Sequence, residues 1–163
     1  MATILVGPEE TKFVIHQALL CERSRYFAKA LTGFFEESRT GIIKLEDVSP
    51  FLFKIVVTWL YYNKIFYTVS DDSSSIDHDF AKFKSETEVL TKGINGYDAS
   101  TWPSQVLVEL YVLADRLDMR ELRINTIDAL DEAKEQSRLD VSSYNFIDSN
   151  TTATSPLRKY AVD

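Results

Sequence analysis

The hydrophobic positions at the start of the chain fall into two short segments separated by a polar turn. Residues 4–7 read Ile-Leu-Val-Gly, residues 8–11 read Pro-Glu-Glu-Thr, and residues 12–15 read Lys-Phe-Val-Ile. β-branched and aromatic residues favour strands, and a short polar interval that contains proline favours a turn. The pattern therefore predicts a β-hairpin. Residues 41–45, Gly-Ile-Ile-Lys-Leu, predict a third strand.

Helical patterns lie between and after these strands. Residues 12–35 predict a strand that runs into two short amphipathic helices. Ser24 is well placed to cap the second helix, which covers residues 25–31, and Gly33 ends it.

A longer helix is predicted over residues 51–62. Ser49 and Pro50 precede it, and proline is tolerated at the first helical position. Only Lys54 and Thr58 interrupt its apolar side chains. A helix with almost no polar face is either buried on most sides or covered by a partner.

A polar insertion follows at about residues 70–101. It begins with a run of Asp and Ser and continues with mixed charged residues, so we expect a long surface loop that is partly disordered. Apolar periodicity returns in two further helices, over residues 106–117 and 120–137.

Beyond residue 137 the chain is rich in Ser and Thr. We therefore expect one domain over residues 1–138, and a C-terminal tail over residues 139–163 that holds a short helix and is partly disordered.

The composition of the chain narrows the classes of partner. With 163 residues, of which 45% are hydrophobic, the chain can bury one core without disulfides. A net charge of −7 repels phosphate backbones and anionic lipids, and no run approaches the roughly 20 apolar residues of a membrane helix. Cys21 is the single cysteine, and the N-terminus lacks the features of a secretory signal. We expect an intracellular protein, cytoplasmic or nuclear, that binds neither nucleic acid nor membrane.

Blocks of residues between positions 4 and 138 follow one another in a distinctive order. They read FVIH, LLCERSRYF, GFFEES, IIKLEDVSPFLF, WLYY and LYVLADRLDMREL. This order resembles the BTB/POZ domain family, and the tail SPLRKYAVD is similar to that of fungal members. The resemblance implies an α+β fold in which a small three-stranded sheet is flanked by a cluster of about five helices. It also implies a function in binding other proteins.

The residues that could carry chemistry are few. His16 matches the histidine at the start of the family's first helix, and we expect it to form a structural hydrogen bond. Cys21 lies on an apolar helix face, where a thiol usually packs. Residues 77–79, Asp-His-Asp, lack the spacing of a calcium loop and predict a solvated charge run. The five glycines of the chain do not have the spacing of a phosphate-binding loop. We predict no catalytic residue, no cofactor site and no metal site.

Aromatic side chains near the end of the long helix suggest a surface for a partner. Tyr61, Tyr62, Phe66 and Tyr67 are the candidate partner-binding residues, because aromatic clusters dominate binding hot spots. The alternative is that they fill the core. If they bind a partner, replacing Tyr62 and Tyr67 together by Ser should abolish association and spare folding.

The resemblance implies two kinds of assembly. Many members of the family form homodimers through an N-terminal extension, and this chain begins three residues before the first strand, so we do not expect a swapped dimer of that kind. Other members are adaptors that bind a cullin scaffold through regions that correspond here to residues 51–62, the following loop and residues 106–117. Such adaptors carry an apolar-x-acidic signal. Residues 48–70 contain no Asp or Glu, and the nearest match is Val-Ser-Asp at residues 69–71.

Three functions follow from these observations. The first is a non-enzymatic interaction module that acts as a scaffold or oligomerises. The second is a substrate adaptor of a cullin-based ubiquitin ligase. The third is a small enzyme of an unrecognised kind, which would require a cleft where titratable groups converge.

Overall fold

The structure is a computed structural model, and it describes residues 1–69, 75–83, 93–134, 139 and 141–162. The elements in chain order are β1 (Ala2–Val6), β2 (Thr11–Ile15), α1 (Gln17–Arg23), α2 (Arg25–Thr32), α3 (Glu36–Thr40), β3 (Ile42–Leu45), α4 (Pro50–Tyr62), α5 (Ile76–Phe80), the 3-10 turns η1 (Ala81–Phe83) and η2 (Ala99–Thr101), α6 (Ser104–Arg116), α7 (Arg120–Lys134), α8 (Val141–Asn150) and α9 (Pro156–Val162).

The three predicted strands form one mixed sheet. Its order is β2-β1-β3, with β2 antiparallel and β3 parallel to β1. The hairpin between β1 and β2 turns at Gly7, whose φ of +78° few other residues adopt, and the Glu10 N–H donates to the Gly7 carbonyl at 3.1 Å. The predicted hairpin and the predicted third strand are both present.

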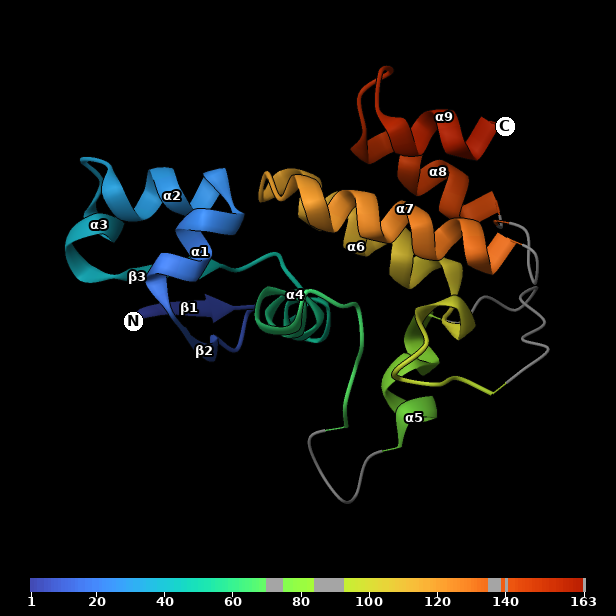
Figure 1. Cartoon of the computed structure of the whole chain (residues 1–163), viewed down its shortest axis with the longest axis horizontal. Coiled ribbons are helices and arrows are strands. Elements are labelled where there is room, and N and C mark those ends of the chain that lie inside the picture. Colours follow the sequence, from blue (N-terminus) through green and yellow to red (C-terminus); the bar gives the residue numbers. More distant parts are fainter. Residues whose placement is uncertain (70–74, 84–92, 135–138, 140, 163) are drawn as a thin grey trace.

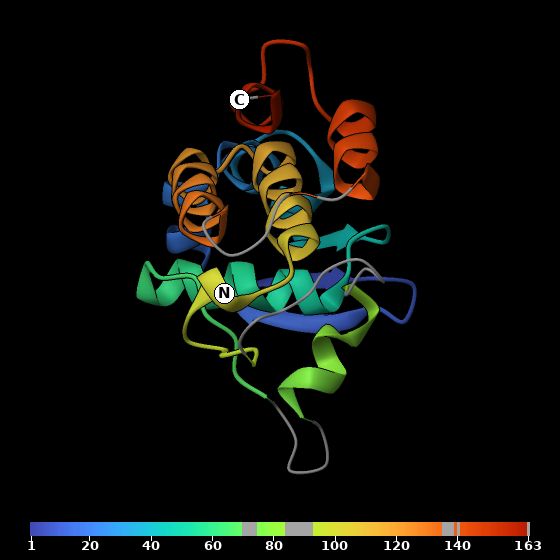
Figure 2. The ribbon, with the colours of Figure 1, turned by 90° about the vertical axis from the view of Figure 1, so that its right-hand side faces the viewer.

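The helices cover one face of this sheet and extend away from it. The sheet and α1 to α3 lie at one end of the molecule, α4 lies in the middle, and α8 and α9 lie at the far end (Figure 1). Seen from the side, α6 and α7 run side by side above α4 (Figure 2). The core includes the fully buried side chains of Trp59, Trp102 and Tyr111. The fold is mixed α and β, as expected.

The predicted helix boundaries rest on identifiable contacts. The Ser24 hydroxyl accepts from the Phe27 N–H at 3.2 Å and donates to the Leu117 carbonyl at 2.5 Å, so it caps α2 and ties it to the end of α6. Helix α4 begins at Pro50, one residue before the predicted range, with the proline at the first helical position, but the Ser49 side chain forms no capping hydrogen bond. The Trp59 indole N–H donates to the Asn125 Oδ1 at 2.8 Å and joins α4 to α7.

The insertion is not only a surface loop. Its residues 76–83 form α5 and η1, and residues 93–98 lead into η2, whereas residues 70–74 and 84–92 lie outside the described part. Phe80 is fully buried, with its ring centroid 4.9 Å from that of Phe51 and 5.1 Å from that of Trp102. Phe83 is also buried. These two aromatic side chains anchor a segment of polar average composition in the core.

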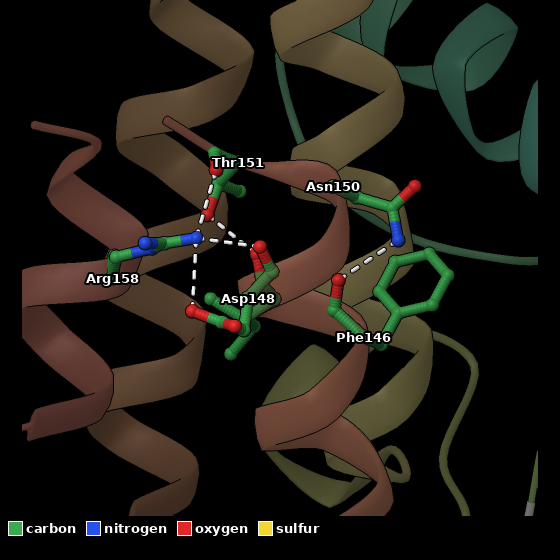
Figure 3. Close-up of polar contacts among 6 residues, drawn as sticks. Phe146, Asp148, Asn150, Thr151 and Arg158 are labelled. Carbon is green, nitrogen blue, oxygen red and sulfur yellow. Dashed lines mark hydrogen bonds and ion pairs between the residues drawn. The ribbon is translucent and has the colours of Figure 1, made fainter. Parts of the chain in front are cut away.

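The C-terminal residues form two helices where a tail was predicted. Ile147 of α8 and Leu157 of α9 are buried. Arg158 joins the two helices: its Nη2 donates to the carbonyls of Asp148 at 2.5 Å and Thr151 at 3.0 Å, and it lies 3.0 Å from the Asp148 carboxylate (Figure 3). The described part of the chain therefore contains nine α-helices, more than the five expected, because the insertion, the tail and the loop before β3 each contribute short ones.

Candidate functional site

Tyr61 and Tyr62 are exposed at the C-terminal end of α4. The side chains are 44% and 70% exposed, and the helix ends after them at Asn63, which has a left-handed φ of 53°. The Tyr61 hydroxyl accepts from the His16 N–H at 3.2 Å and lies 2.8 Å from Nδ1 of the same residue. His16 thus forms the structural hydrogen bond expected at the corner between β2 and α1.

The ring of Tyr62 belongs to a cluster with two other aromatic rings. Its centroid lies 5.3 Å from that of Phe66, and the Phe66 ring stacks on Tyr97 at 5.6 Å with an interplanar angle of 13°. Tyr97 is 62% exposed. We call Tyr61, Tyr62, Phe66 and Tyr97 the aromatic patch. The sequence pattern did not indicate Tyr97, because it comes from the insertion and is distant from the helix along the chain.

Tyr67, the fourth candidate residue, lies in the core. It is 5% exposed, its hydroxyl donates to the Asp79 Oδ2 at 2.6 Å, and the Lys54 Nζ lies 4.7 Å from its ring centroid. Burial, followed by the hydrogen bond to Asp79, raises the pKa of Tyr67 well above its ordinary value, so the phenol stays protonated. Its position fits the alternative that this side chain fills the core, because a partner cannot contact a ring that the fold covers.

A groove opens beside β2. We call it the edge pocket; it encloses about 750 Å³ and is lined by Thr11 and Phe13 of β2, by Pro50, Phe51 and Lys54 of α4, by Tyr67, and by His78, Asp79 and Ala81 of the insertion. Asp79 is therefore not part of a solvated charge run; its side chain is 20% exposed and accepts the Tyr67 hydroxyl. His78 is 80% exposed, as a solvated residue would be.

Titratable groups do meet in the edge pocket, which is the feature an enzyme would require. The Lys54 Nζ donates to the Thr68 carbonyl at 2.6 Å, and burial lowers the pKa of its ammonium group. Tyr67 and Asp79 are bonded to each other. Lys54 of α4 lies over the Tyr67 ring, and Tyr67 is hydrogen-bonded to Asp79 of the insertion. The three side chains thus join the insertion to α4.

A second exposed apolar feature lies between α2 and α3. Phe34 is fully exposed and Phe35 is 64% exposed. Phe35 and Glu37 line a smaller pocket of about 390 Å³, together with α2 residues and Arg116 of α6. Residues 35–37, Phe-Glu-Glu, fit an apolar-x-acidic pattern outside the region where it was expected. The earlier match at residues 69–71 extends beyond the described residues.

The position of Cys21 agrees with a packing role for its thiol. Cys21 is half-buried, and burial raises the pKa of its thiol. In the residues that the structure describes, no group of three or more His, Cys, Asp or Glu side chains is placed to hold a metal ion. Over the same residues, no helix is long and apolar enough to span a bilayer.

Comparison with known families agrees with this architecture. The family model described as the BTB/POZ domain matches residues 2–86, just over half of the chain, from β1 through α4 into the insertion. No curated protein matches the chain. With the hairpin, the parallel third strand and α1 to α4 inside the matched region, the chain belongs to the BTB/POZ domain family, whose members are protein-interaction modules.

Proposed function

We propose that this protein acts without catalysis, as a scaffold or oligomerisation module that binds protein partners through the aromatic patch. Membership of the BTB/POZ family supports a role in protein interaction, and the observation that favours this particular surface is the ring cluster around Tyr62. The net charge of −7 favours a protein over a nucleic acid as the partner.

The physical argument concerns exposed aromatic area. A tyrosine ring contributes a large apolar surface at a low entropic cost, and its hydroxyl can still find a polar partner at an interface. Phe66 holds the rings of Tyr62 and Tyr97 in place, with both its neighbours more than 60% exposed. Burying this preorganised cluster against a partner would therefore release water without ordering many loose side chains.

Tyr62→Ser tests the proposed surface, with Tyr144→Ser on α8 as a matched control. Tyr144 is also exposed, at 43%, and lies outside the patch. Light scattering coupled to size exclusion measures self-association, and affinity capture with mass spectrometry identifies other partners. We expect Tyr62→Ser to abolish the association of the wild-type chain and Tyr144→Ser to preserve it. If Tyr62→Ser and Tyr144→Ser both associate to the same extent as wild type, the patch is excluded as the contact surface.

A role as substrate adaptor of a cullin-based ubiquitin ligase is the second candidate. The observation in its favour is the exposed pair Phe34 and Phe35, followed by Glu37 beside a pocket against α6. A pulldown with a purified cullin scaffold tests this role, with Phe35→Ser as the variant and Tyr144→Ser, outside the expected contact regions, as the control. Retention of the cullin by wild type and its loss only with Phe35→Ser would support the adaptor. Failure of wild type to retain any cullin would reject it.

A further inference from the structure

Within the residues that the structure describes, one edge of the sheet presents unpaired backbone groups. In the described part of the chain, β2 has β1 as its only strand neighbour. The Thr3 N–H donates to the carbonyl of Gly41, the residue before β3, at 2.8 Å, and the Gly7 N–H donates to the carbonyl of Leu45 in β3 at 2.9 Å. Successive residues of a strand direct their backbone groups to opposite sides, so the intervening residues of β1 pair with β2.

The register then fixes which groups of β2 are unpaired. Ile4 lies opposite Phe13 and Val6 lies opposite Thr11, so the backbones of Thr11 and Phe13 face β1. The N–H and C=O groups of Lys12 and Val14 consequently point away from the sheet. Within the described residues no hydrogen bond to these groups is present. A strand edge of this kind is a template for an added strand.

The edge pocket lies on the correct face to receive side chains from such a strand. Thr11 and Phe13, the residues of β2 that line it, belong to the alternate set whose side chains face the helices. The side chain of an added residue placed next to Phe13 would point to this same face. It would enter a groove walled by Phe51 of α4 and Ala81 of the insertion. A large apolar side chain fits these walls.

On the face of β2 opposite the edge pocket, the exposed Lys12 side chain favours a negatively charged residue in an added strand. Lys12 is exposed and takes part in no ion pair among the described residues, whereas Lys44 on the opposite edge pairs with Glu10 at 2.6 Å. A lysine at a strand edge discourages pairing with neutral or basic strands. An acidic residue opposite Lys12 would satisfy its charge, and a β-branched residue would suit the half-exposed Val14.

We propose that the free edge of β2 binds an extended peptide from a partner protein, in antiparallel register. The peptide carries a β-branched residue opposite Val14, a large apolar residue that enters the edge pocket beside Phe13, and an acidic residue opposite Lys12. The backbone bonds to Lys12 and Val14 provide affinity, and the pocket and the Lys12 charge provide selectivity. This site is separate from the aromatic patch and does not depend on it.

A second copy of the chain is a competing occupant, with a different prediction. Two copies of β2 paired about a two-fold axis at Phe13 would place Lys12 opposite the neutral Val14 of the other copy. The charge of Lys12 would then gain nothing from pairing. Such a dimer would therefore be indifferent to a change of charge at this position.

The test uses a blocked peptide of the form Thr-Thr-Val-Phe-Glu-Thr-Thr and a second peptide with Lys in place of Glu. The dissociation constants are measured by NMR titration against the whole chain. We expect the Glu peptide to bind wild type more tightly than the Lys peptide, and Lys12→Glu to weaken the Glu peptide by roughly 3- to 10-fold and to strengthen the Lys peptide. Lys64→Glu makes the same change in net charge at another exposed site and should alter neither affinity by more than about twofold.

A backbone variant provides an independent measurement. Val14→Pro removes an outward N–H that no described residue uses, so it should weaken the Glu peptide roughly fivefold. In wild type, bound peptide should slow hydrogen exchange at the Lys12 and Val14 amides. If Val14→Pro does not fold, the hydrogen exchange of wild type and the peptide affinities of Lys12→Glu still test the proposal.

Absence of binding at millimolar peptide, or equal effects of Lys12→Glu and Lys64→Glu, would overturn the proposal. So would a dimer of the free chain that dissociates in Val14→Pro and persists in Lys12→Glu, since a second copy would then occupy the edge.

Discussion

Tyr62 and Tyr67 are five positions apart, and the structure predicts opposite results when each is replaced by Ser. Tyr62 is 70% exposed on the aromatic patch, and Tyr67 is 5% exposed between α4 and the insertion. Tyr62→Ser should therefore affect association and leave the free energy of unfolding nearly unchanged. Tyr67→Ser should remove a large part of the stability of the domain.

The magnitude for Tyr67 follows from its contacts. Replacing a buried aromatic side chain by a small one costs about 3–5 kcal/mol. The lost hydroxyl also leaves the mostly buried Asp79 carboxylate without this donor, which costs roughly 1–3 kcal/mol more. The two terms overlap, so we expect a loss of about 4–6 kcal/mol, against a typical total of about 5–15 kcal/mol. For Tyr62→Ser, which loses mainly the ring contact with Phe66, we expect less than about 1 kcal/mol.

Urea unfolding followed by circular dichroism measures both values, provided that the slope with denaturant is unchanged. Tyr67→Phe is the control, because it keeps the ring and should lose only about 1.5–3 kcal/mol for the hydrogen bond to a charged acceptor. Equal stability of Tyr67→Ser and Tyr62→Ser would refute the placement of Tyr67 in the core. For the same reason, the double replacement of Tyr62 and Tyr67 is now expected to destabilise the fold strongly and not to spare it, and Tyr62 should be replaced alone when binding is tested.

Three further predictions concern other parts of the fold. Phe80→Ala should lower the free energy of unfolding by about 3–5 kcal/mol in the same assay, and a change below about 1 kcal/mol would show that the insertion does not anchor in the core. The hydrogen bond from Arg116 lowers the pKa of Asp47 below its ordinary value of 3.8, so the stability from this pair is present above that value and is lost as the pH falls through the lowered pKa. Arg116→Gln should raise the Asp47 pKa in an NMR titration, and an unchanged pKa would contradict the pairing. Arg158→Ala should speed hydrogen exchange in α9 without changing exchange in the sheet, whereas a uniform change would argue against a local role.

The elements that the sequence predicts well are those with a dense apolar pattern. The hairpin, the third strand and α4 are packed with β-branched and aromatic residues, so each segment indicates its own conformation. Helices α8 and α9 lack such a pattern. Each buries few side chains, Ile147 and Leu157 among them, and polar contacts of Arg158 hold the two together. Contacts of this kind arise only when the chain has folded.

The candidate surface was predictable only where it follows one helix. Tyr61 and Tyr62 stand out because they end an apolar helix, but nothing in the local pattern distinguishes the buried Tyr67 from them. Tyr97 joins the patch through its stacking on Phe66, a contact between segments distant along the chain. The exposure of Phe34 was equally unpredictable from the sequence, because an aromatic residue after a helix usually packs inward.

The insertion contributes to both proposed binding surfaces. Near one end of its described part, His78 and Asp79 line the edge pocket, and near the other end Tyr97 stacks on Phe66 within the aromatic patch. A backbone contact also joins the insertion to the segment after α4, because the Tyr67 N–H donates to the Gly96 carbonyl at 2.8 Å. A Cβ at Gly96 would lie 2.1 Å from the Tyr67 carbonyl oxygen, so only glycine permits this approach. The insertion therefore supplies residues to both surfaces, a contribution that its polar average composition did not indicate because it depends on contacts with distant segments of the chain.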